Sequence, residues 1–188
     1  MKLKKLGYLL AGNLFACTLY ASPPQWEMIP NESQLTFTAT QNGSPVSGEF
    51  KSFATNLQVD VNDLKNSSID IVIDMNSINA SYAEVKTTLL TPDWFNVKVF
   101  PKAEFKSTDF TKTGENAYQA KGTLNIRDKS LPVTLTFTSS FPSENKGLVE
   151  GSAVIKRNAF GVGQGEWAGT DQVKDEVTVN FKVAAIKK

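Results

Sequence analysis

From Ser33 onward, apolar and polar residues alternate along the chain with a period of two. In residues 177–183 valine or phenylalanine occupies every odd position, while threonine, asparagine and lysine lie between them. The alternating segments are 35–40, 69–74, 118–126, 133–138, 149–155 and 177–185. One apolar face and one polar face are typical of antiparallel strands with one side in water. The pattern therefore predicts an antiparallel sheet.

Turn-forming residues separate the predicted strands at short, regular intervals. They lie at 42–45, 63–67, 113–116, 127–130 and 143–147. About eight strands at hairpin-like spacing favour a meander that closes as a barrel or folds as a sandwich. One segment, 80–90, has helical spacing instead, with Ser81 as a cap and Pro92 as the stop. We expect one all-β domain with one short helix.

The N-terminal residues have the pattern of a secretory signal peptide. Three lysines precede an uncharged apolar run from Leu6 to Ala21. A membrane-spanning helix needs about 20 apolar residues, so this run is too short to span. We expect cleavage after Ala21, with residues 1–21 as the signal and 22–188 as the exported domain. A lipoprotein signal with Cys17 lipidated remains an alternative, although Phe15 fits that pattern poorly.

The composition excludes several kinds of chemistry. A net charge of +1 with 40% hydrophobic residues indicates neither disorder nor a nucleic-acid partner. The chain has no histidine, and its single cysteine, Cys17, lies in the predicted signal. Ser-His-Asp and Cys-His catalysis and His-ligated metals are therefore excluded. Segment 60–64 offers carboxylate oxygens, but it lacks the glycine and the glutamate of a calcium loop, and we predict no metal site.

The sequence "NAFGVGQGEW", residues 158–167, carries three alternating glycines. A dinucleotide-binding fingerprint needs a helix after the glycines and further strands beyond it. Here no helical period follows, and a single predicted strand remains. We therefore interpret the run as a loop in which glycine permits positive φ. Phe160 and Trp167 in this loop would either plug the core or form the rim of an apolar cavity.

Three ordered motifs resemble those of the YceI-like family. They are "TPDWFNVKVFPKAEFKS" at 91–107, "GTLNIRDKSLPVTLTF" at 122–137 and "IKRNAFGVGQGEW" at 155–167. The resemblance runs from about Trp26 to Lys187. The chain departs from the family pattern in two places: the predicted helix has no histidine, and Asp128 stands where glycine is usual. The missing histidine puts in doubt any head-group contact made from that position.

The resemblance implies a lipocalin-like, eight-stranded antiparallel β-barrel that is exported to the periplasm. It also implies that the barrel holds a polyisoprenoid, a quinone- or prenyl-diphosphate-like amphiphile. With the strand alternation, this gives a set of ligand-binding residues, whose faces a one-residue bulge would invert. Residues expected to line the tunnel are Phe37, Phe50, Ile71, Phe105, Leu124, Leu135, Phe137, Val179 and Phe181. Residues expected at its mouth are Trp94, Phe95, Phe160 and Trp167, with Arg157 or Arg127 near an anionic head group.

The sequence therefore predicts a non-enzymatic lipid-binding or carrier protein. It predicts no catalytic residue and no cofactor other than a bound isoprenoid lipid, and it is compatible with a homodimer. Two alternatives stay open. One is an enzyme that acts on such a lipid with Asp, Glu, Lys or Tyr as the proton-transfer group. The other is a periplasmic adaptor whose filled barrel binds a membrane redox partner.

Overall fold

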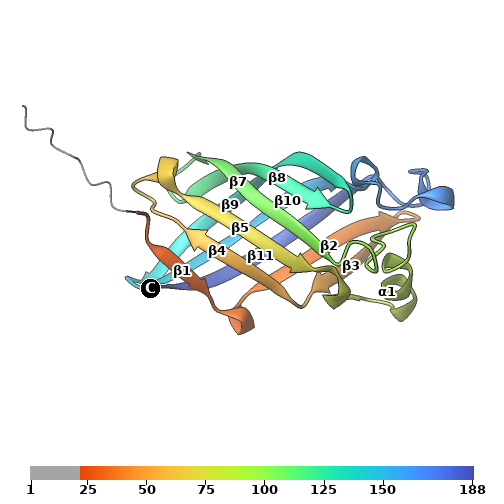
Figure 1. Cartoon of the computed structure of the whole chain (residues 1–188), viewed down its shortest axis with the longest axis horizontal. Coiled ribbons are helices and arrows are strands. Elements are labelled where there is room, and N and C mark those ends of the chain that lie inside the picture. Colours follow the sequence, from red (N-terminus) through yellow and green to blue (C-terminus); the bar gives the residue numbers. More distant parts are fainter. Residues whose placement is uncertain (1–21) are drawn as a thin grey trace, which may run out of the picture.

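The structure is a computed structural model that describes residues 22–188 (Figure 1). The predicted signal peptide, with Cys17, lies outside the described residues. The strands are β1 (Gln25–Met28), β2 (Gln34–Gln41), β3 (Ser44–Phe50), β4 (Phe53–Gln58), β5 (Ser68–Asp74), β6 (Ile78–Ala80), β7 (Lys102–Lys112), β8 (Ala117–Ile126), β9 (Lys129–Ser143), β10 (Lys146–Lys156) and β11 (Glu176–Lys187). The helix α1 spans Ala83–Leu89. Short 3-10 turns lie at Pro30–Glu32, Leu64–Asn66, Met75–Ser77, Arg157–Phe160 and Gly165–Trp167.

The strands form a closed antiparallel barrel. The order β1-β4-β5-β7-β8-β9-β10-β11 returns to its start, because β11 also pairs with β1. At one end of the barrel the sheet continues as β11-β2-β3-β6. β11 pairs with both β1 and β2, so these two strands act as one long strand bent at the Pro30–Glu32 turn. β3 with β4 and β5 with β6 are related in the same way, which confirms the predicted eight-stranded barrel.

The period-two alternation places the apolar residues inside, as predicted. On β8, Tyr118, Ala120 and Leu124 are buried, and the residues between them are more exposed. Gly122 lies on the same inner face, where the ring of Phe105 occupies the space beside it. A side chain at Gly122 would collide with that ring and with the backbone of β7, so glycine is required by close approach.

A bulge in β7 changes which residues point inward. The register with β8 shifts between Ser107 and Asp109. As a result Phe105 and Phe110, which are five positions apart, both face the interior. Alternation alone would have placed Phe110 on the outer face.

Helix α1 and the long loop between β10 and β11 lie at the same end of the barrel (Figure 1). The helix is shorter than the predicted 80–90, because Ala80 belongs to β6. The prediction that Ser81 caps the helix is wrong. The cap position is Tyr82, and the Ser81 hydroxyl donates a hydrogen bond to the Ser47 carbonyl (2.8 Å), which ties this turn to β3.

Candidate functional site

The interior of the barrel is only partly filled by its own side chains. On β11 the inward-facing Val177, Val179 and Phe181 are half-buried, although their neighbours on the outer face are exposed. The inward residues of β9, such as Leu135 and Phe137, are half-buried in the same way. Apolar residues that face inward and remain partly accessible must border a cavity, because a packed core would bury them.

The central part of this cavity has a volume of about 170 Å³ and an apolar wall broken only by Arg157. We call it the central compartment. Twelve of the predicted binding residues border it: Phe37, Phe50, Ile71, Trp94, Phe95, Phe105, Leu124, Leu135, Arg157, Phe160, Val179 and Phe181. The sequence prediction missed other wall residues, among them Phe53, Ile73, Met75, Val133 and Val177. Strand parity could have found most of them.

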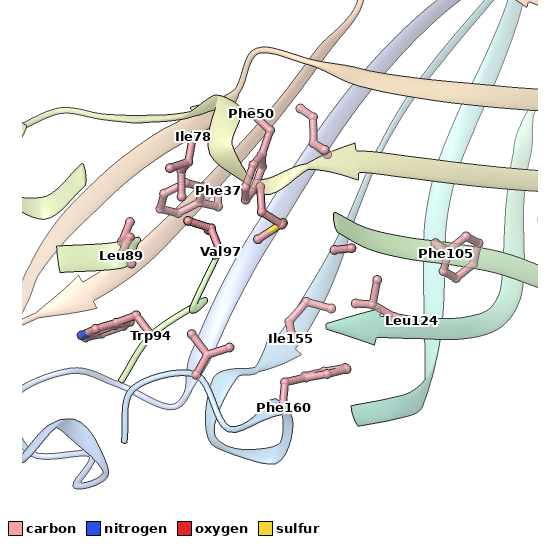
Figure 2. Packing of buried hydrophobic residues seen from close by; sticks show 14 of the residues in the cluster. Phe37, Phe50, Ile78, Leu89, Trp94, Val97, Phe105, Leu124, Ile155 and Phe160 are labelled. Atoms are coloured by element: carbon pink, nitrogen blue, oxygen red, sulfur yellow. The ribbon is translucent and has the colours of Figure 1, made fainter. Parts of the chain in front are cut away.

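A second cavity of about 710 Å³ lies beside α1 and is called the helix-end compartment. Trp167, predicted at the mouth, borders it. It shares the wall residues Phe37, Leu89 and Trp94 with the central compartment. Figure 2 shows the packing from Leu89 and Trp94 at this end to Phe105 and Leu124 within the barrel. The polar groups of its wall are Gln41, Ser81, Tyr82, Glu84 and Thr88.

A third cavity, of about 490 Å³, lies at the opposite end beside β1 and is called the terminal-end compartment. Phe137 borders this compartment rather than the central one. Its ring stacks on Tyr118, with centroids 5.8 Å apart, and meets Phe181 edge-on at 6.4 Å. Phe181 borders the central compartment as well. The three compartments therefore succeed one another along the barrel and share parts of their walls.

Arg157 is only 3% exposed, and backbone carbonyl oxygens accept hydrogen bonds from its guanidinium. Its Nε donates to Lys174 (3.1 Å), its Nη1 to Val162 (3.0 Å) and Gly163 (3.3 Å), and its Nη2 to Gly169 (2.7 Å) and Val173 (2.9 Å). These bonds use all five N–H groups that an arginine has. Burial lowers the pKa of Arg157 and the nearby Asp175 opposes that shift. A head-group contact, as predicted from the sequence, would find no free donor on this side chain.

Gly163 is the glycine that the Arg157 site requires. Its φ is +81°, and a side chain there would collide with the guanidinium. The loop interpretation of residues 158–167 is therefore confirmed: the glycines permit left-handed backbone and close approach. Phe160 is only 2% exposed and packs deep in the core rather than at the rim.

Arg127, the other cation considered for a head group, does not border the three compartments. Its Nη1 donates to the carbonyls of Trp94 and Gly161, the latter at 2.7 Å. Its guanidinium carbon lies 5.8 Å from the ring centroid of Phe100. Arg127 thus joins the segment after α1 to the loop between β10 and β11.

The three sequence motifs meet at the helix end of the barrel. The carbonyl of Asp93 accepts hydrogen bonds from the backbone N–H groups of Gly163 (2.8 Å) and Gln164 (2.7 Å). Arg127, from the second motif, bonds to both of the other segments. The rings of Trp94 and Trp167 lie 5.6 Å apart across the contact. Residues far apart in the sequence therefore build one cap over the barrel.

The carboxylates of segment 60–64 accept hydrogen bonds within their own turn. Asp60 accepts a hydrogen bond from the backbone of Asn62 (2.9 Å), and Asp63 accepts one from the Asn66 amide (2.7 Å). Among residues 22–188 no group of three acidic side chains is arranged to hold a metal ion. In the same part of the chain no helix is long and apolar enough to cross a membrane.

An eight-stranded antiparallel barrel around an apolar cavity is the architecture of barrels that enclose one small ligand. Residues 26–185 match the YceI-like domain, and the chain belongs to this family. It is 30% identical to Protein YceI of Salmonella newport over 139 residues, 72% of this chain and 71% of that protein. UPF0312 proteins of Photorhabdus laumondii and Yersinia match over 88 residues, so the match spans 45% of the length of these curated relatives.

Solved structures share the fold. The structure of BcnA from Burkholderia cenocepacia superposes with a TM-score of 0.80 at 30% identity, over 84% of this chain and 99% of that one. A polyisoprenoid binding domain from Saccharophagus degradans, implicated in plant cell wall breakdown, superposes with a TM-score of 0.68 at 12% identity. That likeness covers 88% of this chain and 99% of the domain, and at this identity it shows the fold alone.

Proposed function

We propose that this protein binds and carries an isoprenoid lipid, with the hydrocarbon chain in the central compartment and its ends in the two outer compartments. The observation that carries the proposal is the inner wall of β9 and β11. There Leu135, Val179 and Phe181 face a cavity that other side chains do not fill. A long, apolar, narrow space fits a chain of isoprene units, and the N–H groups of Arg157 at its middle are already bound to backbone carbonyls.

The hydrophobic effect supplies the binding energy. Transfer of apolar surface from water gives about 25 cal/mol per Å². The central compartment shields the middle of such a chain on all sides, while the outer compartments, of about 710 and 490 Å³, fall in the usual size range of ligand sites. The polyisoprenoid-binding description of the Saccharophagus domain supports the same ligand class.

The residues that line the central compartment support lipid binding without catalysis. Within the described part of the chain, Arg157 is the one ionisable side chain that borders the central compartment, and its donors are engaged. General acid–base catalysis needs a titratable group within hydrogen-bond reach of the reacting atom. An enzyme acting on the lipid would have to use the outer compartments, where Glu84 and Asp60 lie.

The carrier would work in the periplasm. The lysine-rich start and the uncharged run from Leu6 to Ala21 support export of the domain 22–188. A carrier that shields an isoprenoid from water is useful in an aqueous compartment between two membranes.

The proposal is tested by measuring the lipid content of a variant whose central compartment is blocked by a larger side chain. The protein is purified from a native host as the exported chain, and lipids extracted from it are identified by mass spectrometry. Val179→Trp fills the central compartment, whereas Thr178→Trp places the same side chain on the exposed outer face of β11. We expect isoprenoid in the wild type and in Thr178→Trp, and loss of most of it in Val179→Trp with folding retained.

Three results would contradict this function. Wild-type protein without lipid, which captures a membrane redox protein instead, would favour the adaptor. Chemical conversion of the extracted lipid by the purified protein would favour the enzyme. Equal lipid content in the two tryptophan variants would place the lipid outside the barrel.

A further inference from the structure

The indole N–H of Trp94 is a buried donor with nothing to bind. Trp94 is 8% exposed, and among the described residues its Nε1 has no hydrogen-bond partner. Buried tryptophan N–H groups usually find an acceptor, and a buried donor left unsatisfied costs about 1–3 kcal/mol. The unsatisfied N–H of Trp94 therefore lowers the free energy of unfolding with no structural gain, at the wall that the central and helix-end compartments share.

The tryptophan at the opposite end differs in this respect. Trp26 borders the terminal-end compartment, and its Nε1 donates to the carbonyl of Val59 (3.0 Å). In Figure 2 the indole nitrogen of Trp94 points away from the barrel interior, on the side of Leu89 and the helix. The unpartnered donor therefore lies toward the helix-end compartment, where the wall becomes polar.

The charges around this compartment disfavour an anionic group. Its wall contains Glu84 and, among the residues that border it, no lysine or arginine. Arg157 lies next to it on the central side, but all of its N–H groups bind backbone carbonyls. A diphosphate that leaves water needs several cationic or N–H partners. The wall provides none of the cationic ones and adds a carboxylate of the same sign.

A neutral acceptor suits the same wall. The guanidinium carbon of Arg157 lies 5.7 Å from the ring centroid of Trp94. A cation near the indole face draws electron density from the ring, which makes its N–H a stronger donor. A carbonyl oxygen needs one such donor and carries no charge to be desolvated.

We propose that Trp94 determines head-group specificity: its indole N–H donates to the carbonyl oxygen of an uncharged, quinone-like head group in the helix-end compartment. The isoprenoid tail then runs through the central compartment, and the cation-poor wall with Glu84 selects against prenyl diphosphates. Trp167, whose ring lies 5.6 Å from that of Trp94, covers the indole and shifts to admit the head group. This inference rests on the proposed function.

Three probes with the same farnesyl tail separate the head groups: a farnesyl benzoquinone, farnesyl diphosphate and the tail as a hydrocarbon. Their dissociation constants are measured by calorimetry on lipid-free full-length mature protein. Wild type should bind the quinone about tenfold more tightly than the hydrocarbon, the worth of one hydrogen bond. The diphosphate should bind more weakly than the quinone.

Trp94→Phe should remove the tenfold preference for the quinone over the hydrocarbon, because both probes lose the same apolar contacts and the quinone alone loses a hydrogen bond. Because both probes are compared within one variant, any general effect on folding cancels. The control Trp26→Phe removes an indole N–H at the opposite end; it changes the affinity for all three probes alike and should keep the tenfold ratio between quinone and hydrocarbon. Glu84→Gln should reduce the preference for the quinone over the diphosphate severalfold, because it removes the carboxylate that repels the diphosphate.

The inference is overturned if wild type prefers the diphosphate, if Trp94→Phe keeps the quinone preference, or if Trp26→Phe removes it. In each case the tail still binds and the proposed function stands. If the hydrocarbon and both other probes fail to bind, the proposed function fails, and this inference fails with it.

Discussion

The guanidinium of Arg157 and the indole of Trp94 stand 5.7 Å apart beneath the loop between β10 and β11. Arg157 contributes a buried charge that five backbone carbonyls surround, and Trp94 contributes a buried donor that has no acceptor among residues 22–188. The N–H groups of Arg157 all have acceptors without a ligand, whereas the indole N–H of Trp94 needs one from outside the described residues. Arg157 is therefore a structural residue of the cap, while Trp94 is the residue that we propose for head-group binding.

This division predicts that Arg157→Lys destabilises the protein without a specific effect on lipid choice. Lysine offers a compact ammonium with three donors and cannot reproduce the planar fork that reaches Lys174, Val173 and Gly169. We expect the free energy of unfolding to fall by about 2–4 kcal/mol, because several buried carbonyls lose their partners. Urea denaturation measures this change.

The adjacent exposed cation provides the control. Lys156→Ala should change the free energy of unfolding by less than about 0.5 kcal/mol. If Arg157→Lys changes the free energy of unfolding as little as Lys156→Ala but alters which head group is retained, the structural role is wrong and Arg157 contacts the ligand.

Gly151 is a second position where the structure sets a strict limit. It lies on the inner face of β10, where a side chain would meet the Thr136 carbonyl, Phe137 and Phe181. Gly151→Ala should destabilise the protein by about 1–3 kcal/mol, because the backbone of β9 cannot move away cheaply. Gly169→Ala meets nothing within 4 Å and is the matched control in the same thermal unfolding series. Equal melting temperatures for the two variants would contradict the tight packing of β9, β10 and β11.

The strands, turns and inner face followed from the sequence because alternation reports directly on a sheet with one wet side. In 177–185, for example, no bulge interrupts the pattern, and every predicted inward residue of β11 lies inside. The faces of Phe105 and Phe110 could not both be predicted, since the bulge between Ser107 and Asp109 depends on the pairing with β8. The predicted number of eight barrel strands is confirmed, but the structure was needed to show that β1 and β2 together form one of them through their shared partner β11.

The role of Arg157 was hidden from the sequence for another reason. Its partners are backbone carbonyls of residues 162–174, and backbone groups leave no signature in residue types. The sequence analysis expected this cation near an anionic head group, but the loop between β10 and β11 folds around it instead. The unsatisfied N–H of Trp94 could not be predicted from the sequence either, because it depends on which acceptors lie within hydrogen-bond distance in the folded chain.

Lipid retention should not depend on pH between about 5.5 and 7.5, because the chain has no histidine. The Lys129 hydrogen bond lowers the pKa of Asp128. A carboxyl with a lowered folded pKa stabilises the fold above its unfolded pKa near 4, and this contribution is lost as the pH falls through the folded value. The change of stability with pH that Asp128 causes is therefore confined to acid below about pH 4. Lipid content measured after dialysis at several pH values between about 5.5 and 7.5 tests the prediction, and loss of lipid within this range would contradict it.

Trp167 should matter more for holding the lipid than for folding. It is half-buried, borders the helix-end compartment and packs on Trp94 from the loop side. Trp167→Ala opens that side of the compartment and exposes part of the ligand to water. We expect lipid to exchange out of Trp167→Ala at least tenfold faster, since lost coverage of about 60 Å² at 25 cal/mol per Å² corresponds to roughly that factor. The loss in stability should stay small, because hydrogen bonds to the Asp93 carbonyl and from the Arg127 guanidinium hold the loop independently of this ring.

Trp167→Phe separates coverage from polarity, because it keeps a ring over Trp94 and removes only the second indole N–H. It should retain lipid nearly as well as wild type. Exchange is followed by transfer of the native lipid to acceptor vesicles, with unfolding measured on the same samples. If Trp167→Ala lowers stability in proportion to its faster exchange, the ring is packing for the cap rather than a cover for the ligand. Fast exchange with an intact melting temperature would show that the loop between β10 and β11 governs release.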